Sequence, residues 1–307
     1  MIIECEGLSK KYGKTLALHE VSLKLEEGVT GLIGPNGAGK STLIKLILGL
    51  IKPTSGKITV FGLDPWTNGE SVRRRIGVLH EKPSFPSWAT GYDLLELVGK
   101  LRGVDNIDRE IEETLTKVGL WDARNSKTAE YSAGMVQRLG IAQAIIGRPE
   151  MVILDEPTAN LDPKMRVEAL EILKAIREEG SSMLISTHIL PELERVCESV
   201  IIIEKGAIVD NGSLESLAEK NYAHSFAIKA NKPKELMETL SQLDYVRDVT
   251  LRQDEVSVRT SNPKQLLEKL EKNEKINKIS HVREETGLLE RIYFEASKQD
   301  SNKNEIQ

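Results

Sequence analysis

The stretch GLIGPNGAGKSTLIKLILGL, residues 31–50, places glycines, a lysine and two hydroxyl side chains between two apolar runs. The preceding run, VTGLIG, has the composition of a buried strand, and STLIKLILGL has the apolar spacing of a helix. Gly34, Gly37 and Gly39 permit backbone torsions that turn successive amide N–H groups toward one point. The N-terminal end of the following helix carries partial positive charge and faces the same point. We therefore expect a multiply charged anion to bind here.

The spacing Gly34-x-x-x-x-Gly39-Lys40-Ser41 is that of the phosphate-binding P-loop. In this motif Lys40 reaches the β- and γ-phosphates of a nucleotide, and the Ser41 hydroxyl ligates Mg²⁺. The alternative is a glycine turn before a core helix, but the full pattern is rare in a chain of this length. The sequence thus predicts a nucleotide-binding P-loop.

Length and charge limit the possible partners. A chain of 307 residues suits roughly two domains. A net charge of -5 gives no bulk attraction to nucleic acid or to anionic lipid, so we expect no nucleic-acid partner. Cys5 and Cys197 lie far apart without metal-type spacing, which favours reduced thiols. The most hydrophobic run, LIKLILGLI, is short and interrupted by Lys45, so we expect no membrane span and no leader.

The order of apolar patterns indicates two domains. Strand patterns precede the P-loop, helical spacing dominates from Thr90 to about Gly147, and strand and helix then alternate as in a largely parallel sheet. A second, weaker cycle of strands and helices begins after Asn221. We expect an α/β domain over residues 1–220 with a helical insertion at about 90–147. A small α+β accessory domain over 221–297 and a polar tail over 298–307 should follow.

The stretch MVILDEPTANLDP, residues 151–163, ends an apolar strand with two acids. Asp155 and Glu156 should therefore lie at the carboxyl edge of the sheet, where α/β folds bind ligands. Asp155 is a candidate for the Mg²⁺ shell, and Glu156 is a candidate general base that polarises the attacking water. The alternative is a pair of surface acids.

The stretch YSAGMVQRLGIAQAI, residues 131–145, is a turn of small residues that leads into a helix. It resembles the LSGGQ-type signature of the ATP-binding-cassette (ABC) family. The matching residues are Tyr131, Ser132, Ala133, Gly134 and Met135, followed by Gln137 and Arg138. The resemblance covers about residues 2–220 and includes the order of the motifs: P-loop, helical insertion, signature, acidic strand, ANLD and STH.

The resemblance implies the fold of an ABC-type cassette, with a mixed sheet plus a helical insertion, and a shared nucleotide site. In that family two subunits hold two ATP molecules head to tail, so Ser132 and Gly134 would serve the γ-phosphate bound by the partner. A helix N-terminus that the chain cannot use on its own nucleotide agrees with this arrangement. His188 matches the histidine that contacts the γ-phosphate and helps hold the attacking water, although a lone histidine is usually structural.

The resemblance also assigns roles to two loops. Asp162 matches the loop that links the two sites, and it can also cap the helix that Pro163 opens. Tyr12 matches an aromatic that stacks on adenine, with an exposed loop tyrosine as the alternative. The predicted catalytic residues are thus Lys40, Glu156 and His188, and the predicted metal ligands are Ser41, Glu81 and Asp155. The predicted nucleotide-binding residues are Tyr12, Gly34, Asn36, Gly37, Ala38, Gly39, Lys40, Ser41, Thr42, Ser132, Gly134 and Asp162.

Two positions depart from the family pattern. Glu81 stands where the family usually has glutamine, and it can still bind metal or water through an oxygen. Ala133 replaces a glycine of the signature, which adds a methyl group where backbone should approach phosphate. One methyl group is expected to alter coupling rather than abolish it.

The sequence therefore predicts an ATPase that energises a membrane transporter as a homodimer on separate permease subunits, at the cytoplasmic face of the membrane. Glu81 and the segment LERIYFEA resemble exporter-type members. An alternative is a non-transport ABC ATPase that acts on ribosomes or DNA, but such proteins usually carry two cassettes, a coiled coil or basic arms. A P-loop kinase or GTPase would leave the signature and His188 unexplained.

Overall fold

The computed structural model describes residues 1–159, 161–219, 224–252, 255–277, 279–284, 287, 289–290 and 292–293. The chain separates into two compact units, Met1–Gly212 and Ser213–Gln307. The predicted polar tail, residues 298–307, and half of the segment LERIYFEA lie outside the described residues. The domain boundaries expected from the sequence remain a prediction.

A six-stranded sheet forms the centre of the first unit, in the order β5-β6-β7-β3-β8-β9. Its strands are β3 (Val29–Ile33), β5 (Ile76–Leu79), β6 (Met151–Asp155), β7 (Ser182–Ser186), β8 (Ser199–Glu204) and β9 (Ala207–Ser213). The five strands from β5 to β8 in this order pair in parallel. β3 and β7 are buried along their whole length, as is typical of central strands in a parallel sheet that is covered on both faces. The carboxyl ends of β3, β6 and β7 meet at one edge, where the predicted site residues follow them.

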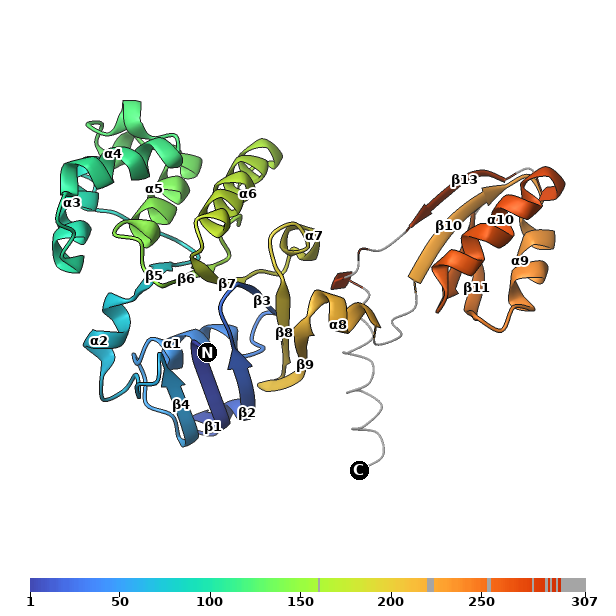
Figure 1. Cartoon of the computed structure of the whole chain (residues 1–307), viewed down its shortest axis with the longest axis horizontal. Helices are drawn as coiled ribbons and strands as arrows, with labels where there is room; N and C mark the ends of the chain where they lie inside the picture. The colour runs from blue at the N-terminus through green and yellow to red at the C-terminus, as the bar shows by residue number, and fades with distance from the viewer. Residues whose placement is uncertain are drawn as a thin grey trace. The chain divides into compact units, whose positions relative to one another are not determined.

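A three-stranded antiparallel sheet, in the order β2-β1-β4, lies beside the helix that follows the P-loop (Figure 1). Its strands are β1 (Ile3–Tyr12), β2 (Thr15–Leu25) and β4 (Ser55–Val60), and the helix is α1 (Lys40–Ile47). One continuous hydrophobic core joins α1 to both sheets. The strand patterns that precede the P-loop in the sequence therefore form part of this antiparallel layer.

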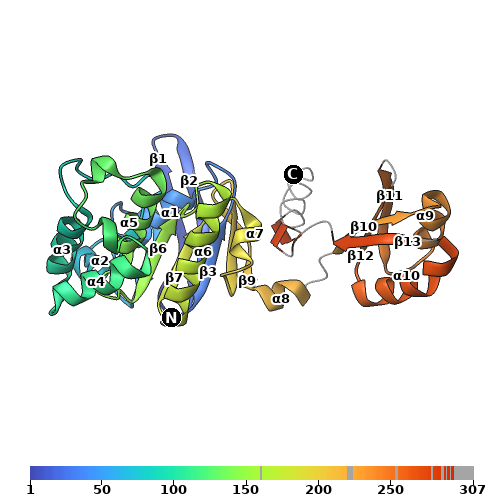
Figure 2. The ribbon, with the colours of Figure 1, turned by 90° about the horizontal axis from the view of Figure 1, so that it is seen from above.

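Three helices gather at one end of the first unit, as Figure 2 shows: α3 (Gly91–Arg102), α4 (Ile107–Lys117) and α5 (Ala133–Ile145). A capping box formed by Thr90 and Asp93 begins α3. The other α-helices of this unit are α2 (Gly69–Arg74), α6 (Pro163–Glu178) and α7 (Leu190–Leu193), and short 3₁₀ helices span Trp121–Ala123 and Thr128–Glu130. Pro163 stands at the first position of α6, where its missing N–H costs no helical hydrogen bond.

The second unit contains a four-stranded antiparallel sheet in the order β11-β12-β10-β13. Its elements are α8 (Leu214–Glu219), β10 (His224–Ala230), α9 (Pro233–Ser241), β11 (Val246–Arg252), β12 (Glu255–Thr260), α10 (Pro263–Asn277) and β13 (Ile279–Glu284). From β10 to β13 the order is β-α-β-β-α-β, the ferredoxin-like arrangement. Apolar residues of both helices and the sheet form a core of their own.

The α/β architecture with parallel and antiparallel strands agrees with the fold class that the sequence predicts. Among the helices of the described ranges, none combines the length and the apolar character needed to cross a bilayer.

Candidate functional site

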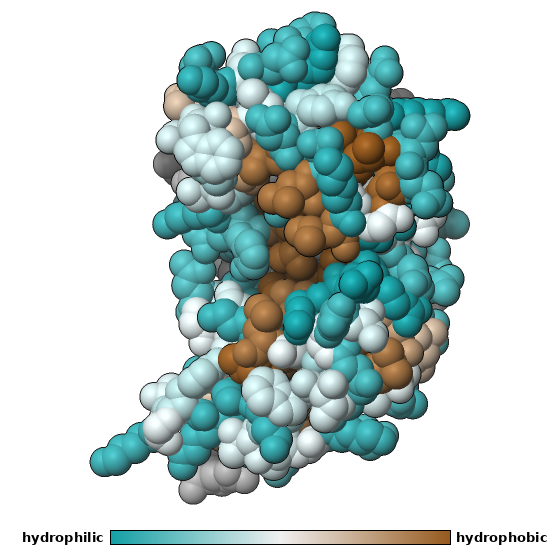
Figure 3. Space-filling view, turned by 90° about the vertical axis from the view of Figure 1, so that its left-hand side faces the viewer, coloured by the Kyte–Doolittle hydropathy of each residue, from teal (hydrophilic) through white to brown (hydrophobic). Residues whose placement is uncertain are grey.

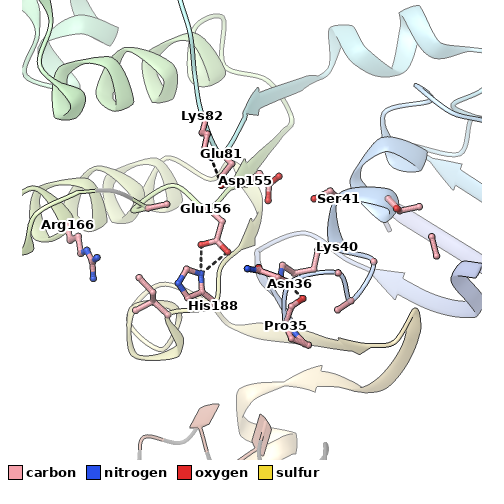
Figure 4. Close-up of a pocket in the computed structure, with 17 residues that line it drawn as sticks. Pro35, Asn36, Lys40, Ser41, Glu81, Lys82, Asp155, Glu156, Arg166 and His188 are labelled. Carbon is pink, nitrogen blue, oxygen red and sulfur yellow. Dashed lines mark hydrogen bonds and ion pairs between the residues drawn. The ribbon is translucent and has the colours of Figure 1, made fainter. Parts of the chain in front are cut away.

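A cavity of about 610 Å³ lies at the edge where the carboxyl ends of the parallel strands meet. Three segments of the chain contribute most of its wall: the P-loop, the end of β6 and the end of β7 (Figure 4). The lining residues are Ala17, Pro35, Asn36, Gly37, Ala38, Gly39, Lys40, Ser41, Thr42, Glu81, Lys82, Asp155, Glu156, Ala159, Arg166, His188 and Ile189. The fold thus brings all predicted catalytic and metal-binding residues to one cavity.

The P-loop glycines meet two different requirements. Gly37 and Gly39 have φ angles of 80° and 113°, in the left-handed region that side chains disfavour. A Cβ at Gly34 would lie 2.2 Å from the carbonyl oxygen of Ile203, so this glycine allows the loop to lie against β8. Gly39 also precedes α1 without any side-chain cap, which leaves the helix end to interact with a bound anion.

Lys40 is buried and held on the loop by its own ammonium group. Its Nζ donates to the carbonyl oxygens of Gly34, at 2.6 Å, and Pro35, at 3.3 Å. Burial lowers the pKa of Lys40, while the negative charges of Glu156, Asp155 and Glu81 oppose this shift. A cation is therefore already placed in the wall of the cavity, opposite carboxylates.

Glu156 is held by several contacts at the end of β6. Its backbone has a φ of 52°, a conformation that is strained for a residue with a side chain. Its N–H donates to the carbonyl oxygen of Ser186 at 2.8 Å, and the Thr187 hydroxyl lies 3.1 Å from Oε2. His188 Nδ1 lies 3.0 Å from both carboxylate oxygens, and Figure 4 shows the two side chains turned toward each other. Since an ionised carboxylate only accepts, Nδ1 is the donor in this contact.

The predicted metal ligands offer oxygen donors to the same cavity. The Ser186 hydroxyl donates to Asp155 Oδ1, and the Ser41 hydroxyl lies across the cavity (Figure 4). In the described part of the chain, no group of three or more His, Cys, Asp or Glu side chains could hold a metal unaided. Mg²⁺ usually takes one or two protein carboxylates and completes its shell with phosphate oxygens and water. This donor set therefore fits Mg²⁺ only together with a nucleotide.

Five of the predicted nucleotide-binding residues do not line the cavity: Tyr12, Gly34, Ser132, Gly134 and Asp162. Gly34 lies beneath the loop, where its carbonyl accepts from Lys40. Tyr12 is 44% exposed at the end of β1.

The other three lie at the beginnings of two helices. Ser132 is exposed and caps α5 by accepting from the N–H of Met135, and Asp162 caps α6 by accepting from that of Met165. Gly134 is buried, and a Cβ there would lie 2.5 Å from the Met165 sulfur. The capping role expected for Asp162 is thus present.

The structure adds residues to which the sequence assigned no role. The buried hydroxyl residues Ser186 and Thr187 hold the two acids. The sequence shows them at the end of an apolar stretch, but it does not show that this strand pairs with the strand of Asp155. Gln137 donates to the carbonyl oxygen of Pro157 at 2.7 Å and so ties α5 to the loop after Glu156. Arg166 lines the cavity from α6, and no sequence signal singled it out.

The family described as "ABC transporter" matches residues 18–159. The ABC transporter ATP-binding protein YdbJ of Bacillus subtilis (strain 168) is 42% identical over 216 residues, which cover 70% of each chain. The daunorubicin/doxorubicin resistance ATP-binding protein DrrA of Streptomyces peucetius is 32% identical and aligns with 86% of this chain and 82% of its own.

A solved dimeric ATP-binding cassette, in a post-hydrolysis state with ADP and Pi, is similar with a TM-score of 0.62 and 26% identity. The similarity covers 69% of this chain and 98% of that one. Neither relative's name refers to ribosomes or DNA, so the alternative function is not favoured. The chain belongs to the ABC transporter family, in which it is an ATP-hydrolysing subunit that energises a transporter.

Proposed function

We propose that two copies of this chain close head to tail over two Mg²⁺-bound ATP molecules and drive export through separate membrane subunits. The observation that carries this proposal is the position of the signature. Ser132 and Gly134 lie outside the cavity that the chain's own P-loop lines. The N-terminus of α5 can bind an anion but does not face the chain's own nucleotide site. It is therefore free to contact the nucleotide that a partner binds.

Each residue in the cavity has a chemical task in this proposal. The P-loop amides and Lys40 bind the β- and γ-phosphates, and Glu156 takes a proton from the attacking water. His188 lies beside that base and contacts the γ-phosphate. Ser41 and Asp155 would hold Mg²⁺, with Glu81 as a weaker ligand because its side chain is 54% exposed, and the ion would neutralise charge that develops on the phosphate oxygens.

An apolar area on the first unit suits a membrane subunit. Figure 3 looks onto the side that carries α2 and α3, where hydrophobic side chains form a strip between polar borders. Trp88, just before α3, is 74% exposed, and Leu97 and Leu101 on α3 are 56% and 67% exposed. Exposed apolar areas bordered by polar residues are typical of interaction sites. We propose that permease subunits dock here and hold the ATPase at the cytoplasmic face of the membrane.

Export is favoured over uptake by one relative and one residue. The relative DrrA is named for drug resistance. Glu81, the acid in place of the usual glutamine by which this chain resembles exporter-type members, lines the cavity. For the second unit we propose a docking or regulatory role, because every residue assigned to chemistry belongs to the first unit.

One variant tests the catalytic step at the shared site. Glu156→Gln should bind ATP but stop turnover, because an amide keeps the shape of the side chain and cannot take a proton. Size-exclusion chromatography with ATP and Mg²⁺ should then show a stable dimer that the wild type does not accumulate. Wild-type turnover in Glu156→Gln would remove Glu156 from its role.

A mixing experiment tests the head-to-tail geometry. Lys40→Ala damages the P-loop side of a site, and Ser132→Arg damages the signature side. A mixed dimer has one intact and one doubly damaged site, so mixing the two inactive proteins should restore part of the ATPase activity. If Ser132→Arg already weakens ATP binding by the monomer, the signature acts within its own chain and the geometry is wrong.

A further inference from the structure

Thr187 follows the last residue of β7 and lies against the carboxylate of Glu156. Its side chain is buried, with 1% of the residue exposed. The parallel pairing of β6 with β7 sets this position, because Asp155 pairs with Ser186 and the next residue of each strand is Glu156 and Thr187. The register of the sheet therefore places a hydroxyl next to the predicted general base.

The hydrogen bonds of Thr187 determine where its proton points. The N–H of Ile189 donates to Thr187 Oγ1 at 3.1 Å, so the oxygen already accepts on one side. A hydroxyl has a single proton to donate. Glu156 Oε2, at 3.1 Å, is an acceptor, so the Thr187 proton is directed to it.

Glu156 needs such support because its backbone is unfavourable. A φ of 52° for a residue with a side chain persists only where surrounding contacts hold it. His188 also contacts the carboxylate, but its side chain is 63% exposed and faces the cavity. In the proposed site His188 also contacts the γ-phosphate, whereas Thr187 is buried, does not line the cavity and contacts Glu156 independently of a bound nucleotide.

We propose that Thr187 is a positioning residue that aims the Glu156 carboxylate at the attacking water throughout the ATPase cycle. The inference rests on the proposed role of Glu156 as general base. Thr187 makes no contact with ATP in this proposal. Loss of its hydroxyl therefore changes turnover and leaves nucleotide binding intact.

The test is the steady-state ATPase reaction of the full chain with Thr187→Val, which removes the hydroxyl at nearly constant volume. We expect kcat to fall about tenfold and the KM for ATP to stay within about twofold. Thr187→Ser keeps the hydroxyl and should restore kcat to within about twofold of wild type. Thr30→Val is the matched control, because Thr30 is also buried and bonds another side chain, Ser199 Oγ, at 2.8 Å.

Dependence on Glu156 separates positioning from a structural role. In the background of Glu156→Ala, Thr187→Val should change the residual single-turnover rate by less than about twofold, because a residue that acts through Glu156 has nothing left to position. Thr187→Ala provides a second variant if valine prevents folding, which circular dichroism will show.

Three results overturn the inference: wild-type kcat in the hydroxyl-free variants, an equal loss of kcat in Thr187→Ser, or a full tenfold loss in the Glu156→Ala background. Failure of the proposed function gives a different pattern. In that case Glu156→Ala itself turns over ATP like the wild type.

Discussion

Two helix N-termini of this chain have the features of anion-binding sites, and only one of them is complete. The N-terminus of α1 follows Gly39 without a side-chain cap, begins with Lys40 and faces a cavity with carboxylates on its far wall. The N-terminus of α5 is capped by Ser132, and its first turn contains no charged residue. The first end can bind a phosphate in the isolated chain. The second has no charged residue in its first turn and does not line that cavity, so in the proposed dimer it contacts the phosphate that the other chain binds.

Removing the cation from the complete site should give the largest effect. Lys40→Ala should weaken ATP binding by roughly 30-fold or more, because a charge-assisted contact to the phosphates is lost. Isothermal titration calorimetry measures this affinity directly. Lys45→Ala is the matched control, since Lys45 lies on the same helix, is exposed and should leave the affinity unchanged. Equal affinities of wild type and Lys40→Ala would contradict the P-loop assignment.

Blocking the incomplete site should affect turnover but not binding. Ser132→Arg places a large side chain at the exposed start of α5, and the ATPase rate should fall about tenfold or more while the monomer's affinity for ATP stays within about twofold. ATPase assays over a range of protein concentrations, paired with calorimetry, separate the two quantities. Ser71→Arg, at another exposed serine, should leave both unchanged. If the affinity of Ser132→Arg for ATP falls together with its ATPase rate, the N-terminus of α5 binds the chain's own nucleotide, as that of α1 does.

Variants of Gly134 distinguish two explanations for a small residue in the signature. The glycine either makes room for a side chain of α6 or serves the phosphate bound by the partner. A Cβ at this position would lie 2.5 Å from the Met165 sulfur, so the glycine makes room for a side chain of α6. Gly134→Ala should therefore reduce the ATPase rate several-fold, and Met165→Ala in the same chain should restore most of the loss. Thermal unfolding of the single and double variants shows whether packing is relieved. If the double variant stays as slow as Gly134→Ala, the glycine serves the partner's phosphate.

The residues on the P-loop side of the cavity could be predicted from the sequence to lie together, because spacing alone carries that information. Glycines at fixed intervals before a lysine and a hydroxyl require one backbone shape, and the apolar strand that ends in two acids places Asp155 and Glu156 at the same edge. The α/β class followed from the alternation of strand and helix patterns. These features depend on neighbours in the chain, which a sequence displays directly.

Contacts between distant segments could not be predicted in the same way. Ser186 and Thr187 reach the acids only because β7 pairs with β6 in one register, and a sequence does not state its register. The packing of Met165 on Gly134 and the bond from Gln137 to Pro157 likewise join segments about 20 to 30 residues apart. The side chains of such residues form no sequence motif, and their role is evident only from their contacts in the folded structure.

The smallest effect should come from Glu81, the acid that stands where the family usually has glutamine. It lines the cavity of the complete site, but its side chain is 54% exposed and lies 3.9 Å from the Lys82 ammonium. Solvent and a neighbouring cation screen an exposed carboxylate, so it contributes little to binding.

Glu81→Gln keeps an oxygen donor and removes the charge, and the Mg²⁺ concentration for half-maximal ATPase activity should change by less than about threefold. Asp155→Asn should raise the same concentration at least about tenfold, because Asp155 lies at the end of β6 with its carboxylate oriented by Ser186. A shift in Glu81→Gln as large as that in Asp155→Asn would mean that Glu81 is itself a metal ligand, and the complete site would then hold its cation through two carboxylates.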